Sequence, residues 1–200
     1  MCGIAGIICQ NQHLEDIICM LRVMRHRGPD ATRSIALQSD GFLGHNRLSV
    51  IDLHSRATQP LWDRSHRYCL VFNGEIYNYR ILRAELIQLG HAFETQSDSE
   101  VLIEAWAEWG RNCISRFIGM FSFAIWDDVQ KRLTLVRDRL GEKPLYYSFI
   151  RNNQTTTLIF ASEMKGLIAY PHLNKQISSQ GWGLLQLAMT KNVRKQKTQP

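Results

Sequence analysis

Apolar and polar residues follow two different periods along this chain, which together predict a mixture of strands and helices. Short runs rich in β-branched and aromatic residues predict buried or half-buried strands. These strands are expected at Gly3–Cys9, Ser34–Gln38, Phe42–Asn46, Tyr68–Phe72, Met120–Trp126, Leu133–Arg137 and Leu158–Ala161. We expect the fourth of them to end at the Asn73-Gly74 pair, and Asp127-Asp128 to be a turn.

Apolar residues at helical spacing predict helices in three other segments. The helices are expected at Leu14–Met24, Ile76–Leu89 and roughly Ser99–Trp109. Gly90 and Gly110 stand where the second and third should end. The helices are thus grouped between sets of strands, which favours an α+β fold with layered antiparallel or mixed sheets over a doubly wound parallel sheet.

Length and composition indicate one globular domain. The chain has 200 residues, of which 44% are hydrophobic and 21% charged, enough to bury a core without disulfides or metal. The domain is expected over residues 2–170, followed by a linker and a tail over 171–200. Periodicity is lost after about Gln180, so we expect the last residues to be poorly ordered.

Two features favour a cytoplasmic location without membrane contact. The longest apolar run, Phe117–Trp126, is about half as long as a membrane-spanning helix. The N-terminus has no basic region ahead of its apolar stretch, so it does not resemble a signal peptide.

The net charge of +6 arises at one end of the chain. No acidic residue follows Glu163, and the basic residues beyond it are Lys165, Lys175, Lys191, Arg194, Lys195 and Lys197. A basic tail can contact nucleic acid, but this one has no interleaved aromatic residues. We therefore expect a solvated tail and no nucleic-acid partner.

The cysteines are scattered and odd in number, which favours reduced thiols and no metal site. They are Cys2, Cys9, Cys19, Cys69 and Cys113. Cys2 differs by position, because removal of Met1 would leave it with a free α-amino group. An α-amine titrates near ~7.7–8.0 and a free thiol near ~8.5, so one residue can supply both base and nucleophile. An incidental early cysteine is the alternative.

The segments around Cys2 resemble a known family. Met1-Cys2-Gly3-Ile4-Ala5-Gly6 is similar to the start of class II glutamine amidotransferases, which are N-terminal-nucleophile hydrolases. Four more blocks match that family in order, namely His26-Arg27-Gly28-Pro29-Asp30, Arg47-Leu48-Ser49-Val50-Ile51-Asp52, Asn73-Gly74-Glu75-Ile76-Tyr77-Asn78 and Ser97-Asp98-Ser99-Glu100. The sequences of the blocks at 26–30 and 73–78 resemble those of the asparagine synthetase branch. The resemblance implies a four-layer αββα sandwich with mostly antiparallel sheets.

The resemblance also implies L-glutamine as substrate and assigns residues to it. Cys2 would attack the side-chain amide, with Asn73 and Gly74 as the oxyanion hole. Arg47 would bind the substrate carboxylate and Asp98 its ammonium group. The remaining pocket residues would be Leu48, Ser49, Val50, Ile51 and Glu75. The alternatives are a surface arginine at 47, a helix cap at Asp98 and a tight turn at Asn73-Gly74.

Other polar residues are not expected to take part in catalysis. Arg27, Asp30 and the Arg137–Lys143 segment are interpreted as ion pairs that shape loops. The histidines His26, His45 and His91 have no spacing typical of a catalytic triad or a metal site.

Asparagine-forming members of the family carry a second domain with a Ser-Gly-Gly-x-Asp-Ser loop that binds ATP, and no such segment occurs in this sequence. ATP and Mg would belong to that domain, so no cofactor is expected here. The chain is interpreted as a truncated synthetase that is at most a glutaminase, able to form a homodimer or to use a synthetase domain supplied separately. Two alternatives stay open: an inactive remnant or binding module, and an amidotransferase of a cell-surface polysaccharide pathway.

Overall fold

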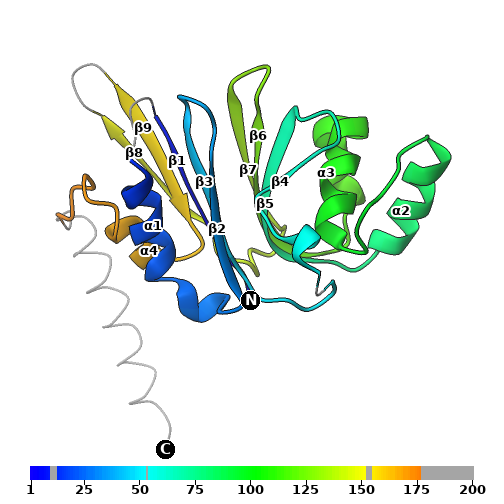
Figure 1. The fold of residues 1–200 in the computed structure, drawn as a ribbon, viewed down its shortest axis with the longest axis horizontal. Helices are drawn as coiled ribbons and strands as arrows, with labels where there is room; N and C mark the ends of the chain where they lie inside the picture. The colour runs from blue at the N-terminus through cyan, green and yellow to red at the C-terminus, as the bar shows by residue number, and fades with distance from the viewer. Residues whose placement is uncertain (10–12, 53, 152–154, 177–200) are drawn as a thin grey trace, which may run out of the picture.

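Two antiparallel sheets stack face to face in the computed structural model, with helices on both outer sides (Figure 1). The structure describes residues 1–9, 13–52, 54–151 and 155–176. The first sheet has the order β2-β3-β1-β9-β8, with β1 at Gly3–Ile8, β2 at Ala31–Ala36, β3 at Gly41–Arg47, β8 at Tyr146–Arg151 and β9 at Thr156–Ala161. The second has the order β4-β5-β6-β7, with β4 at Leu61–Trp62, β5 at Tyr68–Ile76, β6 at Gly119–Asp127 and β7 at Arg132–Arg137.

The helices form the two outer layers. On the first sheet lie α1 (Leu14–Arg22) and α4 (Met164–Ile168), and on the second lie α2 (Tyr79–Gln88) and α3 (Asp98–Trp109). Three short 3-10 helices are at Arg25–Arg27, Ser55–Ala57 and Gly110–Arg116. One apolar cluster fills the space between the sheets, and one lies under each helical layer. The αββα sandwich implied by the resemblance is confirmed.

The central strand β1 explains how the chain start is held. It pairs antiparallel with β3 on one side and β9 on the other. Ile4 packs between the sheets, whereas Ala5 and Ile7 pack under α1 and α4. A strand buried on both faces reads as a continuous apolar run, as this segment does. Cys2 directly precedes this strand, so the fold fixes its surroundings.

The prediction that a strand ends at Asn73-Gly74 is wrong. β5 runs on to Ile76, because Asn73 and Gly74 pair with Ser122 and Phe121 of β6. The helix that follows, α2, therefore starts at Tyr79, three residues later than predicted. Long-range pairing here overrides the local turn preference of an Asn-Gly pair. A Cβ at Gly74 would lie 2.3 Å from the Met120 carbonyl oxygen, so close strand packing, not a turn, requires the glycine.

The second strand is displaced from its predicted position. β2 ends at Ala36, and the chain turns at Gln38 with a φ of 50° before β3 begins at Gly41. Gly41 has a φ of +137°, and a Cβ there would lie 1.9 Å from the Ile7 carbonyl oxygen. Only glycine fits this corner. The remaining strands and helices lie within a few residues of their predicted positions, but β4, β8 and α4 were not predicted.

The end of the domain agrees with the sequence pattern as far as it is described. Tyr170 is buried against α1 and α4, and 171–176 follow it on the surface. The boundary after residue 170 stays a prediction, and the predicted disordered tail lies mostly outside the described residues. No helix in the described part of the chain is long and apolar enough to span a membrane.

Candidate active site

A pocket of about 190 Å³ lies where β1 begins, β3 ends and β5 approaches its last residue. The residues implicated by the family resemblance all line it. They are Cys2, Arg47, Leu48, Ser49, Val50, Ile51, Asn73, Gly74, Glu75 and Asp98. The fold thus brings together segments that lie up to 96 positions apart in the sequence.

Cys2 is half-buried at the wall of this pocket. Its Sγ lies 3.4 Å from the Leu48 backbone nitrogen and 3.6 Å from the Leu48 carbonyl oxygen. Burial raises the pKa of the thiol, and the Leu48 backbone opposes this shift. The Leu48 N–H can therefore donate to a thiolate, while the free thiol can donate to the Leu48 carbonyl.

Arg47, the last residue of β3, is buried and holds the loop that follows it. Its Nη1 donates to the His54 carbonyl at 3.0 Å and to Thr58 Oγ1 at 2.9 Å, and its Nη2 donates to the Asp52 carbonyl. These bonds use three of the five N–H groups of a guanidinium. One N–H on Nε and one on Nη2 have no partner within the described residues. The interpretation of Arg47 as a surface arginine is wrong, since the residue is 7% exposed.

Asp98 is the first residue of α3, and its carboxylate lies in the pocket wall. Its Oδ2 accepts a hydrogen bond from Ile76 N at 3.0 Å. Burial raises the pKa of this carboxyl to about 6. The helix cap is Ser97, whose side chain accepts from Glu100 N, so the capping interpretation of Asp98 is wrong.

The side chain of Asn73 ends in an amide buried in the pocket wall. The side chain is 1% exposed, and neither Nδ2 nor Oδ1 has a hydrogen-bond partner among the described residues. Leaving a buried polar group unpaired costs about 1–3 kcal/mol. Native proteins rarely keep such groups without a reason, and this one lines the pocket.

The backbone N–H of Gly74 faces the same pocket. The backbone N–H groups two residues before and two residues after it already have partners. Phe72 N donates to Gln59 Oε1, and Ile76 N donates to Asp98 Oδ2. Alternate residues of a strand direct their N–H groups to the same edge, so the amide of Gly74 lies between these two. β4 ends its pairing with β5 at Leu70, and it does not reach this position.

Comparisons with known proteins show the family of this chain. A family model described as a glutamine amidotransferase domain matches residues 1–199. The chain belongs to this family. An asparagine synthetase (glutamine-hydrolyzing) 3 of Bacillus subtilis is 33% identical over 90% of this chain and 30% of its own length. Asparagine synthetase B of Escherichia coli is 37% identical over 84% of this chain and 30% of its own length.

The amidotransferase domain therefore spans about a third of the length of these relatives. A solved structure of glutamine phosphoribosylpyrophosphate amidotransferase from B. subtilis, in complex with ADP and GMP, has the same fold. Its TM-score is 0.71 at 20% identity, over 84% of this chain and 43% of the other.

The His26–Asp30 segment of the amidotransferase domain braces the pocket from behind. Asp30 N donates to the Arg47 carbonyl at 3.1 Å, and Asp30 Oδ2 accepts from Ser49 N at 2.7 Å. Gly28 lies flat on β3, because a Cβ there would be 2.3 Å from the Asn46 carbonyl oxygen. The predicted ion pairing is confirmed for Arg27, which pairs with Glu163. Asp30 holds the loop through backbone hydrogen bonds instead, and no ion pair of Asp30 is found among the described residues.

His45, Gln59 and Lys143 also line the pocket, although none of them was expected there. His45 is 1% exposed, and burial lowers the pKa of its imidazole to about 3 against a weaker opposing effect of the Phe72 backbone. It lies two residues before Arg47 on the same face of β3. Its spacing from Arg47 was the one feature of the sequence that could have placed His45 in the pocket.

The described residues contain no group of three or more His, Cys, Asp and Glu side chains arranged to hold a metal ion. The pocket brings together the Cys2 thiol, the Arg47 guanidinium, the Asp98 carboxylate and the Asn73 amide, which has no hydrogen-bond partner among the described residues.

Proposed function

We propose that this domain hydrolyses the side-chain amide of L-glutamine to glutamate and ammonia through a thioester on Cys2. The observation that carries this proposal is that a thiol, a buried guanidinium, a buried carboxylate and an unpaired buried amide line one pocket. Glutamine needs each of these groups: a cation for its carboxylate, an anion for its ammonium, donors for its amide oxygen and a nucleophile for its amide carbon.

Arg47 and Asp98 would bind the two charged ends of the amino acid. The two unused N–H groups of Arg47, on Nε and Nη2, form one edge of the guanidinium, which suits a two-pronged bond to a carboxylate. Asp98 Oδ2 accepts from Ile76 N, and the backbone at Asp98 and Ser99 also hydrogen-bonds the carboxylate. As an anion with two oxygens, the carboxylate can accept a further bond from the ammonium. Both side chains are buried, which strengthens their interaction with a bound charge.

In the proposed reaction, the free α-amine of Cys2 takes the thiol proton and Sγ attacks the amide carbon of glutamine. Asn73 Nδ2 and Gly74 N would donate to the oxyanion that forms. When the tetrahedral intermediate collapses, the C–N bond breaks and the ammonium of Cys2 returns its proton to the leaving nitrogen, which departs as ammonia. Water then attacks the thioester and releases glutamate. With Met1 in place the nitrogen of Cys2 is a peptide amide, so the base requires removal of Met1.

The relatives named asparagine synthetase suggest where the ammonia goes. We propose that it serves asparagine formation by an ATP-dependent synthetase unit, which corresponds to the part of those relatives that this chain does not match. On this proposal residues 2–170 are the glutaminase unit, L-glutamine is its substrate, and neither ATP nor Mg binds within it.

The test of the proposed function is an assay of both products. The full chain, with loss of Met1 verified by mass spectrometry, should release glutamate and ammonia in equal amounts from L-glutamine. L-Asparagine, one methylene shorter, is the control substrate and should react far more slowly. Equal rates for the two amides, or no release from glutamine by a folded sample that has lost Met1, would contradict the proposal.

A pH dependence of glutamine binding follows from the raised pKa of Asp98. The carboxyl titrates at about 6, and only its ionised form attracts the substrate ammonium. In a Cys2→Ala background, where no thioester forms, the dissociation constant measured by calorimetry should be about tenfold higher near pH 5 than near pH 7. The Cys2→Ala/Asp98→Asn variant should bind weakly at both pH values. If the affinity of the Cys2→Ala variant for glutamine is the same at pH 5 and pH 7, Asp98 does not bind the substrate ammonium.

A further inference from the structure

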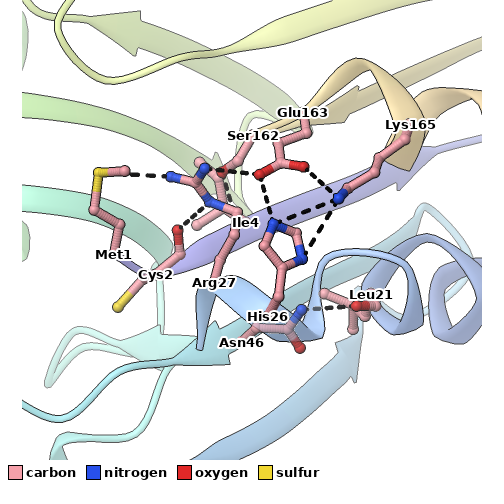
Figure 2. Close-up of polar contacts among 10 residues, drawn as sticks. All are labelled: Met1, Cys2, Ile4, Leu21, His26, Arg27, Asn46, Ser162, Glu163 and Lys165. Atoms are coloured by element: carbon pink, nitrogen blue, oxygen red, sulfur yellow. Dashed lines mark hydrogen bonds and ion pairs between the residues drawn. The ribbon is translucent and has the colours of Figure 1, made fainter. Parts of the chain in front are cut away.

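A cluster of charged side chains lies beside the start of the chain, and Cys2 Sγ points away from it (Figure 2). Arg27, at the end of the first 3-10 helix, lies at its centre. Glu163, directly after Ser162 and β9, faces it together with His26 and Lys165. We call Arg27, Ser162 and Glu163 the anchor, because each binds the first residues of the chain or holds a residue that does.

Arg27 links the nucleophile residue to Glu163. Its Nε donates to the Cys2 carbonyl at 2.9 Å, its Nη1 donates to Glu163 Oε1 at 2.8 Å, and its Nη2 lies 3.9 Å from Met1 Sδ. The arginine is 9% exposed. A buried guanidinium stays in place only when its donors are satisfied, so the carboxylate of Glu163 determines where the guanidinium meets Cys2.

Ser162 fixes the next residue of the same segment. Ile4 N donates to Ser162 Oγ at 2.9 Å, and Ser162 N donates to the Ile4 carbonyl at 2.9 Å. β1 begins at Gly3, so Cys2 lies just outside the strand ladder. Among the described residues, its hydrogen bonds are the one from Arg27 to its carbonyl and those between Sγ and the Leu48 backbone.

Glu163 is held as an anion by Arg27, Lys165 and the imidazole of His26. Besides Arg27, His26 Nε2 lies 3.0 Å from Oε1 and Lys165 Nζ lies 3.1 Å from Oε2. These contacts lower the pKa of the carboxyl to about 2, Arg27 lowering it most and burial opposing them. A carboxylate bound by two cationic side chains and an imidazole, on residues that do not line the pocket, points to a structural task performed by its charge.

We propose that Glu163 is a positioning residue for the nucleophile. Through Arg27 it holds the Cys2 carbonyl, and thereby keeps the thiol and the α-amine of Cys2 directed at the pocket together. The inference rests on the proposed function, since it assigns Glu163 to the same reaction. Glu163 is not expected to affect the affinity for glutamine, because the proposed binding residues Arg47 and Asp98 belong to other elements, β3 and α3.

The test compares Glu163→Gln with Glu15→Gln in the full chain after loss of Met1. Glu15 is an exposed residue of α1 outside the anchor. Glu163→Gln should lower kcat for glutamine by about 10- to 100-fold, the size of effect that a small misplacement of a reacting group produces. KM should stay within about threefold of the parent, and Glu163→Asp should recover part of the lost kcat. Parent-like kcat in Glu163→Gln overturns the proposal.

A double variant separates positioning from simple destabilisation. Arg27→Met should show the same loss of kcat, and adding Glu163→Gln to it should cost little more, since both act through one contact. All rates are divided by the folded fraction, measured by circular dichroism. If that correction removes the whole loss, Glu163 only stabilises the fold and the proposal is wrong. If Glu163→Gln does not fold, Glu163→Asp, which keeps the charge but shortens the side chain, must show a kcat loss at unchanged KM.

Hydrogen exchange tests the anchor even if the chain does not hydrolyse glutamine. The amides of an N-terminal peptide ending at Ile8 should exchange at least about fivefold faster in Glu163→Gln than in Glu15→Gln, because the start of β1 opens locally when the anchor is broken. An inactive parent with this difference contradicts the proposed function and supports the anchor. Equal exchange in both variants overturns the anchor, whatever the parent's activity.

Discussion

Replacing Cys2 with serine is expected to lower kcat for glutamine hydrolysis by at least about 10³-fold while the protein stays folded. Loss of a nucleophile in a comparable hydrolytic site costs about 10⁶-fold. A serine hydroxyl occupies nearly the same space as the thiol, but an α-amine with a pKa near ~8 cannot activate it to the same extent. The measurement is glutamate release under saturating glutamine, with circular dichroism to show the fold.

The matched control for this prediction is Cys19→Ser. Cys19 is another half-buried free cysteine, on α1 and away from the pocket, and its variant should retain activity within about twofold. If Cys2→Ser hydrolyses glutamine as fast as Cys19→Ser, the thioester mechanism is excluded.

Replacing Asn73 with alanine is expected to lower kcat by about 10²- to 10³-fold, with little change in KM. Removing one oxyanion-hole donor has an effect of this size. The amide of Asn73 is already buried and unpaired, so it can donate to a developing oxyanion without first breaking a bond to the protein. KM should change little because Arg47 and Asp98 provide the binding of the ground state.

The same substitution should leave the free energy of unfolding unchanged or higher. An unpaired buried amide costs about 1–3 kcal/mol, and its removal offsets the loss of a small side chain. Asn46→Ala is the matched control: Asn46 is equally buried, but its Nδ2 donates to the Leu21 carbonyl at 2.7 Å and its Oδ1 accepts from Thr32. That variant should lose about 1–3 kcal/mol.

Chemical denaturation of the two asparagine variants measures both free energies. A large loss of stability in Asn73→Ala would mean that the amide has a structural partner, and its catalytic role would then need another explanation. Full activity in Asn73→Ala would remove it from the oxyanion hole.

Periodicity located most of the strands and helices of this fold but not their arrangement. The buried run Gly3–Cys9 reads as a strand because both of its faces are covered. No local pattern shows that β1 lies between β3 and β9, and the layer order came from the resemblance. β8 was missed because it is an edge strand, in which Tyr147 and Phe149 are exposed. Its pattern therefore lacks the alternation of a half-buried strand.

In the candidate site, too, sequence motifs identified some residues, whereas others were identified only in the folded chain. Cys2, Arg47 and Asp98 were assigned by matching motifs, and the structure places them around one pocket. Glu163 could not be connected to Cys2 in this way, because its partner Arg27 is 136 positions away. His45 was set aside because its spacing from the other histidines is not typical of a catalytic triad or a metal site. Its burial in the pocket wall appears only in the folded chain.

Mass analysis after exposure to a glutamine-mimicking electrophile tests whether Cys2 is the nucleophile. The chain, with Met1 removed, is incubated with an equimolar amount of the reagent and digested. One label per chain is expected on the N-terminal cysteine, blocked by excess L-glutamine and absent from Cys9, Cys19, Cys69 and Cys113. Labelling spread over those cysteines, labelling of Cys2 that glutamine does not slow, or no labelling of the folded chain would contradict that role.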